Sequence, residues 1–281
     1  MQRVEFAEIS DYRPATGGLE VRCFGAFEVA RDGVVVHDWR RDKARTLLKH
    51  LIARRGSIPR DVLLDLLWPE LDTESAARNL RVTLHALRHA VSGKQTDGDF
   101  VRTRADAYEL NRDKDVWIDI EVFSSLVETG RRLERQGRPS AAIGCFEAAQ
   151  LLYRDDYLIE DLYADWTFGP RERLKDDYLL VVTRLADAAL EAGDDERCIE
   201  YCHKLLARDS CREDAYQRLM RCHTRLGRRS RALRWYQLCR ETLQRELGLE
   251  PNEVTRGLAA HIAAGASLLS LDRVELTRLA V

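Results

Sequence analysis

The chain has 281 residues, which is enough for one large domain or two domains of ordinary size. Hydrophobic residues make up 45% and charged residues 33%, so the chain can bury a core and lacks the composition of a disordered protein. No apolar run approaches the roughly 18 residues that suggest a membrane span, and the N-terminus lacks the basic and apolar regions of a secretory signal. We therefore expect a cytoplasmic protein.

The seven cysteines are odd in number and spread along a long chain, which is not the pattern of a disulfide framework. Cys198, Cys202 and the adjoining His203 raise the alternative of a metal site, but no CxxC pair accompanies them. Free cysteines are commonly buried as small hydrophobes. Packing is therefore the favoured interpretation, and we expect neither a metal nor a cofactor.

The formal net charge of −2 hides an uneven distribution. Residues 40–104 carry 14 Lys/Arg and 8 Asp/Glu, a balance of +6, whereas residues 119–281 carry 25 and 28, a balance of −3. A basic region within a nearly neutral chain is typical of a domain that meets a polyanion, joined to one that does not.

The chain opens with a polar stretch, residues 1–18, that ends in a glycine pair and predicts a flexible arm. Apolar residues then alternate with polar ones from Leu19 to Cys23 and from Phe27 to Ala30, and a turn sequence precedes Val34–Val36. This pattern predicts two or three short antiparallel strands.

Two helices follow the strands. Apolar residues recur at helical spacing from Lys43 until Gly56 ends the pattern, and Pro59 opens a second helix that Pro69 closes. A third helix is predicted from about Thr73 to Val91, capped by Asp72 or by Thr73 itself.

The third helix has two faces of different character. Its apolar face is formed by Ala77, Leu80, Leu84, Leu87 and Val91. Its basic face is formed by Arg78, Arg81, His85 and Arg88, with His89 at the edge. No carboxylate lies between Glu74 and Asp97, whereas a merely solvated helix usually mixes charges to gain favourable pairs. This clustering indicates a face that meets an anionic partner.

Residues 100–104 and 108–110 predict a β-hairpin with Arg102 and Arg104 on one face, and Val116–Ile118 is a candidate third strand beside it. The order of strands, two helices, a basic helix and a hairpin predicts a winged helix-turn-helix with an additional N-terminal sheet. We assign it to residues 19–118.

Beyond residue 118 the pattern is entirely helical and repetitive. When Gly137, Gly193 and Gly227 are aligned, a small residue follows five positions later in each case (Ala142, Cys198 and Ala232). Gly193 and Gly227 are 34 residues apart, which is the tetratricopeptide period. We therefore predict a tetratricopeptide-like α-helical repeat domain over 119–263, with an irregular stretch at 155–175 and a tail or capping helix at 264–281. The fold class is mainly α.

Six segments in this order carry a family resemblance. They are KARTLL at 43–48, LLDLLW at 63–68, ARNLRVTLHALR at 77–88, RADAYEL at 104–110, GRRSRAL at 227–233 and LQRELGLEP at 243–251. Over residues 19–263 they make the chain similar to the antibiotic regulatory proteins of Streptomyces and other actinomycetes, which join a winged-helix DNA-binding domain to a bacterial transcriptional activation domain. The wing departs from the family pattern, since residues 104–108 stand where relatives commonly show a Pro-Gly-Tyr turn. A phosphate-binding P-loop is absent from the sequence, so control by ATP is not expected.

The resemblance implies a sequence-specific transcriptional activator. Such a protein binds direct repeats in double-stranded promoter DNA, contacts the RNA polymerase holoenzyme, and forms a homodimer at least on DNA. It works in the cytoplasm, associated with the nucleoid.

The expected DNA contacts fall into three groups. The third helix enters the major groove through Arg78, Arg81, His85 and Arg88, the hairpin reaches the minor groove or backbone through Arg102 and Arg104, and Arg40, Arg41 and Lys43 hold phosphate. Which arginines read bases stays open. The ordinary alternative for each group is a solvated surface, which is least favoured for the third helix and about even for Arg40, Arg41 and Lys43, and His85 has capping or packing as its alternative.

Other functions fit the sequence less well. An enzyme is disfavoured because GxSxG, HExxH and GxGxxG patterns are absent from the sequence. A protein-interaction scaffold, whose winged helix does not bind DNA, is the main rival. A regulator gated by a small effector is a third alternative, although no residue cluster indicates the effector. The salt dependence of DNA affinity discriminates between the DNA-binding regulator and the scaffold, because a DNA-binding protein loses affinity steeply as salt rises.

Overall fold

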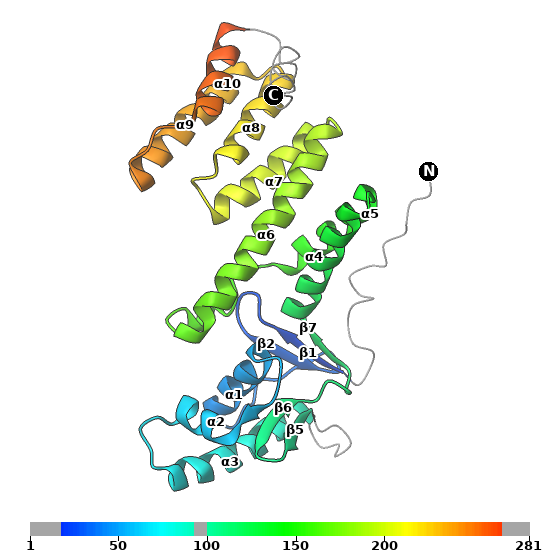
Figure 1. Cartoon of the computed structure of the whole chain (residues 1–281), viewed down its shortest axis with the longest axis vertical. Helices are drawn as coiled ribbons and strands as arrows, with labels where there is room; N and C mark the ends of the chain where they lie inside the picture. Colours follow the sequence, from blue (N-terminus) through cyan, green and yellow to red (C-terminus); the bar gives the residue numbers. More distant parts are fainter. Residues whose placement is uncertain (1–17, 93–99, 266–281) are drawn as a thin grey trace. The chain divides into compact units, whose positions relative to one another are not determined.

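The computed structural model describes residues 18–92 and 100–265 (Figure 1). They form two compact units, the first with residues up to Phe123 together with Leu152–Leu174, the second with Ser124–Leu151 together with the chain from Lys175 onward. Nearly all of the predicted arm, and the 264–281 segment beyond Gly265, lie outside the described residues. No helix in the described ranges is long and apolar enough to cross a membrane.

The first unit contains two small sheets. In the N-terminal sheet, β1 (Leu19–Arg22), β2 (Glu28–Arg31), β3 (Val34–Val35) and β7 (Val116–Ile118) lie in the order β3-β2-β1-β7. In the wing sheet, β4 (Ile58–Pro59), β5 (Val101–Arg104) and β6 (Ala107–Leu110) lie in the order β4-β6-β5. The predicted N-terminal strands and the hairpin are confirmed.

The third strand beside the hairpin is not the predicted one. Residues 116–118 pair in parallel with β1, because Val21 and Ile118, both almost fully buried, lie opposite each other over the same core. The hairpin instead pairs with Ile58–Pro59. Proline, which has no N–H to donate, is tolerated there because β4 is an edge strand. Pro59 therefore caps the second helix rather than beginning it.

Three helices cover the wing sheet: α1 (Asp42–Ala53), α2 (Arg60–Leu67) and α3 (Thr73–Ser92). Their leucines meet in one core, in which Leu47, Leu63, Leu67 and Leu87 are fully buried. Burying each such side chain contributes about 1.5–3 kcal/mol, so this core holds α3 in place and leaves its other face in solvent.

Residues 152–174 belong to the first unit although two helices separate them from it in the sequence. Tyr157 forms a bridge with Phe24, and the amide of Leu158 donates to the carbonyl of Cys23 at 2.9 Å. The amino group of Lys49 on α1, only 5% exposed, binds the carboxylate of Asp161. The stretch predicted as irregular is thus an anchored segment of the winged-helix unit.

Asp119 joins the N-terminal sheet to the first helix of the repeat region. Its buried carboxylate accepts hydrogen bonds from the amides of Cys23, Phe24 and Ile120 at 2.8–2.9 Å. Burial raises the pKa of Asp119 to about 6, although the amide hydrogen bonds oppose that rise. The carboxylate thereby holds the end of β1 against the start of α4 (Asp119–Arg135).

The remaining elements are helical. They are α5 (Pro139–Leu152), η2 (Ile159–Asp161), α6 (Asp165–Glu191), α7 (Asp195–Arg208), α8 (Glu213–Arg225), α9 (Arg229–Leu247) and α10 (Glu253–Ala264). Gly137, Gly193 and Gly227 each end a helix with φ between +69° and +77°, a conformation that glycine adopts without strain. The small residue five positions after each glycine is fully buried, which confirms the predicted repeat.

Several cysteines pack as small hydrophobes in the core of the repeat helices. Cys198, Cys202 and Cys222 are fully buried, and all seven cysteines have free thiols. The hydrogen bond with Cys202 and then burial raise the pKa of Cys198 to about 12, although a hydrogen bond with Cys222 opposes that rise. Within residues 18–92 and 100–265, no group of three or more His, Cys, Asp or Glu side chains is placed to hold a metal ion.

Candidate nucleic-acid interface

The start of α3 is set by a side-chain cap. Asp72 accepts a hydrogen bond from the amide of Ser75 at 2.9 Å, and this bond lowers the pKa of Asp72. Glu74 in the first turn suits the positive end of the helix dipole. With the start defined and the apolar side buried, helical periodicity decides which residues face solvent.

The outer face of α3 consists of exposed side chains at helical spacing: Glu74, Arg78, Arg81, Val82, His85 and His89. Within the described chain, the side chain of Arg81 makes no hydrogen bond or ion pair. Arg78 is 63% exposed and lies 3.3 Å from Glu74, an exposed pair of the kind worth little in water. The guanidinium groups of Arg78 and Arg81 are therefore available to an external anion.

Arg88 and His89 occupy each other's predicted places. At about 100° per residue, His89 lies about 20° from Arg78 and Arg88 about 80° away. The Nη2 atom of Arg88 donates to the carbonyl of Val101 at 3.1 Å and to Oγ1 of Thr103 at 3.0 Å. Arg88 thus fastens β5 of the wing to α3, and His89 faces solvent.

Val82 is a member of the outer face that the sequence reasoning missed. Val82 is 47% exposed and lies about one helical turn after Arg78. The signal was its spacing of four residues from Arg78, which a search for basic residues passes over. An apolar group at this place suits the methyl group of thymine.

The two wing arginines have different surroundings. Arg102 pairs with Asp113 and lines a hollow of about 110 Å³ between the wing and the end of α1. Arg104 is exposed beside the turn at the wing tip and has no ion pair within the described part of the chain. The tip itself is held by the amide of Arg60, which donates to the carbonyl of Asp106 at 2.8 Å. Of the two wing arginines, Arg104 is the more accessible to an external partner.

The three residues predicted to hold phosphate, Arg40, Arg41 and Lys43, also differ in their surroundings. The ammonium group of Lys43 donates to the carbonyl of Leu67 at 2.6 Å, which ties the start of α1 to the end of α2. Nη2 of Arg40 lies 3.0 Å from Nε2 of His89, so Arg40 stands beside the outer face of α3. Arg41 is exposed just before α1.

Comparison with known proteins places the chain among transcriptional regulators. Residues 118–263 match the family model of the bacterial transcriptional activator domain. The regulatory protein DnrI of Streptomyces peucetius is 28% identical over 242 residues, covering 83% of this chain and 88% of that protein. The transcriptional regulator RedD of Streptomyces coelicolor is 25% identical, covering 94% and 77%. MoaR1 of Mycobacterium tuberculosis, a transcriptional regulatory protein, is 26% identical, covering 86% and 78%.

A solved structure supports the fold. Mycobacterium tuberculosis EmbR, in complex with a low-affinity phosphopeptide, superposes with a TM-score of 0.70 at 24% identity, covering 89% of this chain and 66% of that longer one. The family model alone spans more than half of the present sequence. This chain therefore belongs to the bacterial transcriptional activator domain family and is a transcriptional regulator of the Streptomyces antibiotic regulatory type.

Proposed function

We propose that this regulator binds promoter DNA through the outer face of α3 and the tip of the wing. The observation that carries the proposal is the character of that face: Arg78, Arg81, His85 and His89 are exposed on it, Arg40 stands beside it, and Glu74 is its one carboxylate. Exposed like charges repel unless a partner neutralises them. A DNA major groove, about 12 Å wide, accepts a helix of this kind.

The surroundings of each arginine suggest separate roles. Arg81, free within the described chain, is suited to grip a guanine edge with two parallel hydrogen bonds, and Val82 beside it suits a thymine methyl group. Arg78 and His85 on the face, together with Arg40 and Arg41 next to it, serve phosphate. Arg104 serves the backbone or minor groove next to the wing. Arg88, Lys43 and Arg102 act mainly by holding the helix, the wing and the N-terminal arginines in register.

The helical-repeat unit supplies the protein partners in this proposal. We infer that the chain works as an activator on direct repeats, as a homodimer at least on DNA, with contact to the RNA polymerase holoenzyme. Half-sites then lie about 34–36 Å apart, one helical turn of DNA. The site of action is the nucleoid in the cytoplasm. Support comes from the family match and from the stacked helices, which form extended binding surfaces in repeat proteins.

The decisive experiment starts from genomic footprinting, which supplies bound promoter fragments. Fluorescence anisotropy on one such fragment then compares the wild type with Arg81→Ala and with Arg138→Ala, an exposed arginine of the repeat unit. We expect Arg81→Ala to lose about 1–3 kcal/mol of binding free energy and to relax preference at one base pair, with Arg138→Ala unchanged.

The salt dependence separates this function from its main rival. A DNA-binding protein loses affinity linearly in the logarithm of salt concentration, in proportion to the phosphates neutralised. If pure protein fails to bind footprinted fragments even at low salt, the winged helix is a protein-contact module and the DNA-binding proposal is wrong.

A further inference from the structure

Helix α9 carries cations where a helix ordinarily carries acids. Its N-cap and first two turns carry four arginines: Arg228, Arg229, Arg231 and Arg234. Its first turn holds no acidic residue. The two helices directly before it follow the ordinary pattern, with Asp195 and Glu196 in the first turn of α7 and Glu213 and Asp214 in that of α8. Positive charge next to the positive end of a helix dipole is unfavourable unless an anion joins it.

Among these arginines, Arg229 donates to the carbonyl of Ala263 at the end of α10, whereas the other three have no such partner in the described part of the neighbouring helices. Within residues 18–92 and 100–265, Arg228, Arg231 and Arg234 have no ion pair or side-chain hydrogen bond. The nearby carboxylate of Asp195 is engaged by Arg225, and that of Asp214 by Arg212 and Arg218. The charge on this part of α9 is therefore open to an external partner.

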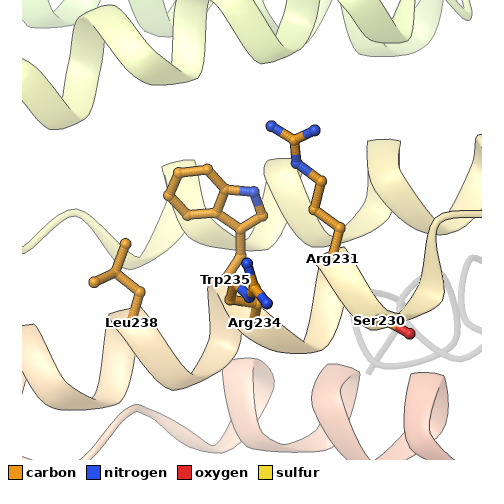
Figure 2. A pocket seen from close by; sticks show the side chains of 5 residues that line it. All are labelled: Ser230, Arg231, Arg234, Trp235 and Leu238. Carbon is orange, nitrogen blue, oxygen red and sulfur yellow. The ribbon is translucent and has the colours of Figure 1, made fainter.

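A pocket of about 420 Å³ lies along the same face of α9 (Figure 2). It is lined by Ser230, Arg231, Arg234, Trp235 and Leu238. Figure 2 shows the indole of Trp235 and the guanidinium of Arg231 rising on the same side of the helix. Leu238 is 41% exposed, so an accessible apolar side chain lies in the same pocket as the guanidinium groups of Arg231 and Arg234.

Two histidines, His203 and His223, lie close to this pocket. The ring of His203 packs on Trp235 with centroids 5.3 Å apart. His223 is 1% exposed, and neither of its ring nitrogens has a hydrogen-bond partner among the residues that the structure describes. Burial is the largest cause that lowers the pKa of His223, and the positive charges of the nearby Arg231 and Arg228 are the next largest.

We propose that this pocket binds an acidic peptide segment of a partner protein, with carboxylates on Arg231 and Arg234 and a large apolar side chain against Trp235 and Leu238. The site lies in the second unit and does not depend on the DNA interface of α3. Arginine binds carboxylates through two parallel hydrogen bonds, and buried aromatic anchors beside arginine are the usual centre of protein interfaces.

A nucleic-acid backbone fits the same observations less well. Phosphates would satisfy the arginines, but a sugar-phosphate chain has no apolar side chain to cover the half-buried Trp235 and the exposed Leu238. Burying that apolar area favours a partner that brings leucine or an aromatic residue between its acidic groups.

The test uses the full-length protein and a short fluorescein-labelled peptide in which aspartates and glutamates flank a central leucine–phenylalanine pair. A second peptide replaces the acids by their amides, and a labelled DNA duplex of unrelated sequence serves as the third probe. Anisotropy compares the wild type with the double variant Arg231→Glu/Arg234→Glu. The matched control is Arg240→Glu, an exposed residue on the opposite side of α9 by helical periodicity.

We expect the acidic peptide to bind and the amide peptide not to. The double charge reversal lowers affinity about tenfold or more, Arg240→Glu changes it little, and thermal unfolding shows that all variants fold. Equal binding to the double variant, or binding of neither peptide, overturns the proposal. If the double variant loses binding to the duplex and the wild type binds neither peptide, the face binds phosphate instead and the proposal is wrong. A variant that ends at Gly265 is measured as well. If only this variant binds the acidic peptide, the pocket belongs to the chain's own C-terminal segment and the proposal is wrong.

Discussion

The guanidinium of Arg88 lies 3.1 Å from the carbonyl oxygen of Val101, so that the helix with the exposed basic face and the wing are fastened to each other. A second bond from the same group reaches Oγ1 of Thr103 at 3.0 Å. The relative placement of Arg81 on the helix and Arg104 at the wing tip depends on this connection. Arg88 is thereby a positioning residue for the proposed DNA interface.

The connection predicts a specific phenotype for Arg88→Ala. We expect unfolding free energy to fall by about 1–2 kcal/mol and DNA affinity to fall several-fold, because hydrogen bonds between helix and wing are lost. The salt dependence of binding should stay close to that of the wild type, since no phosphate contact disappears. Denaturant unfolding and anisotropy at several salt concentrations measure both quantities.

Arg78→Ala is the matched comparison for Arg88→Ala. Its side chain is 63% exposed, so unfolding should change little, whereas the slope of log affinity against log salt should decrease by about one. A reduced salt slope in Arg88→Ala as well would mean that Arg88 itself contacts phosphate.

The wing turn contains a residue in a strained conformation. Ala105 has φ of +53°, which is favourable for glycine and unfavourable for alanine. We expect Ala105→Gly to raise the unfolding free energy by about 0.5–1 kcal/mol, measured by chemical denaturation. The reverse test is Gly33→Ala in the β2–β3 turn, where φ is +77° and destabilisation of similar size should follow. A destabilised Ala105→Gly would show that the turn does not carry this strain.

Gly130 in α4 allows close contact with the helix that follows. A Cβ atom there would lie 2.8 Å from Cζ of the buried Phe146 ring. Gly130→Ala should therefore cost about 1–3 kcal/mol, which exceeds the helix-propensity gain of about 1 kcal/mol. Gly257→Ala in α10, where an added Cβ meets no described atom within 4 Å, is the control and should be neutral or stabilising. Equal behaviour of the two variants in thermal unfolding would contradict this packing.

Asp119 makes the stability of the first unit depend on pH. Its pKa is about 6 when folded, against an ordinary value of 3.8, so folding favours the protonated form. The stabilisation from this group is therefore present in full below about pH 4 and is lost as pH rises through 6. Because the non-titrating Asp119→Asn variant lacks this loss, the stability of wild type relative to the variant should decline between pH 4 and 7.

The expected decline is up to about 3 kcal/mol, and denaturant unfolding of both proteins across this pH range measures it. His50 and His223, whose pKa values burial lowers, titrate in both proteins and cancel in the comparison. A relative stability that is constant with pH would show that the amide hydrogen bonds, rather than burial, control Asp119.

Elements with strong local signals were predicted correctly. The strand from Leu19, the helix from Thr73 and the helix ends at Gly137, Gly193 and Gly227 all follow from periodicity, capping and turn residues within a short window. The burial of Ala142, Cys198 and Ala232 was equally readable, because a repeat places each in the same environment. The basic character of α3 follows from the same periodicity.

The pairing of distant segments was decided by the tertiary structure. From the sequence, residues 116–118 could pair equally well with the hairpin or with β1. Their register with Leu19–Val21 is set only when the core forms. Lys49 shows no local sign of an acidic partner, because Asp161 lies 112 positions along the chain. The winged-helix unit therefore includes a segment that a linear division at residue 118 leaves out.

Sequence alone thus determined the kinds of elements, their order, and the presence of a cationic helix face, since these depend on residues within a few turns of one another. Tertiary structure decided which of the cations are bound by other parts of the fold. Arg88 and Arg102 are held by Val101 and Asp113, whereas Arg81 and Arg104 remain exposed. The physical reason is that a side chain's partners depend on which surfaces the folded core brings together, and a helical period alone does not contain that information.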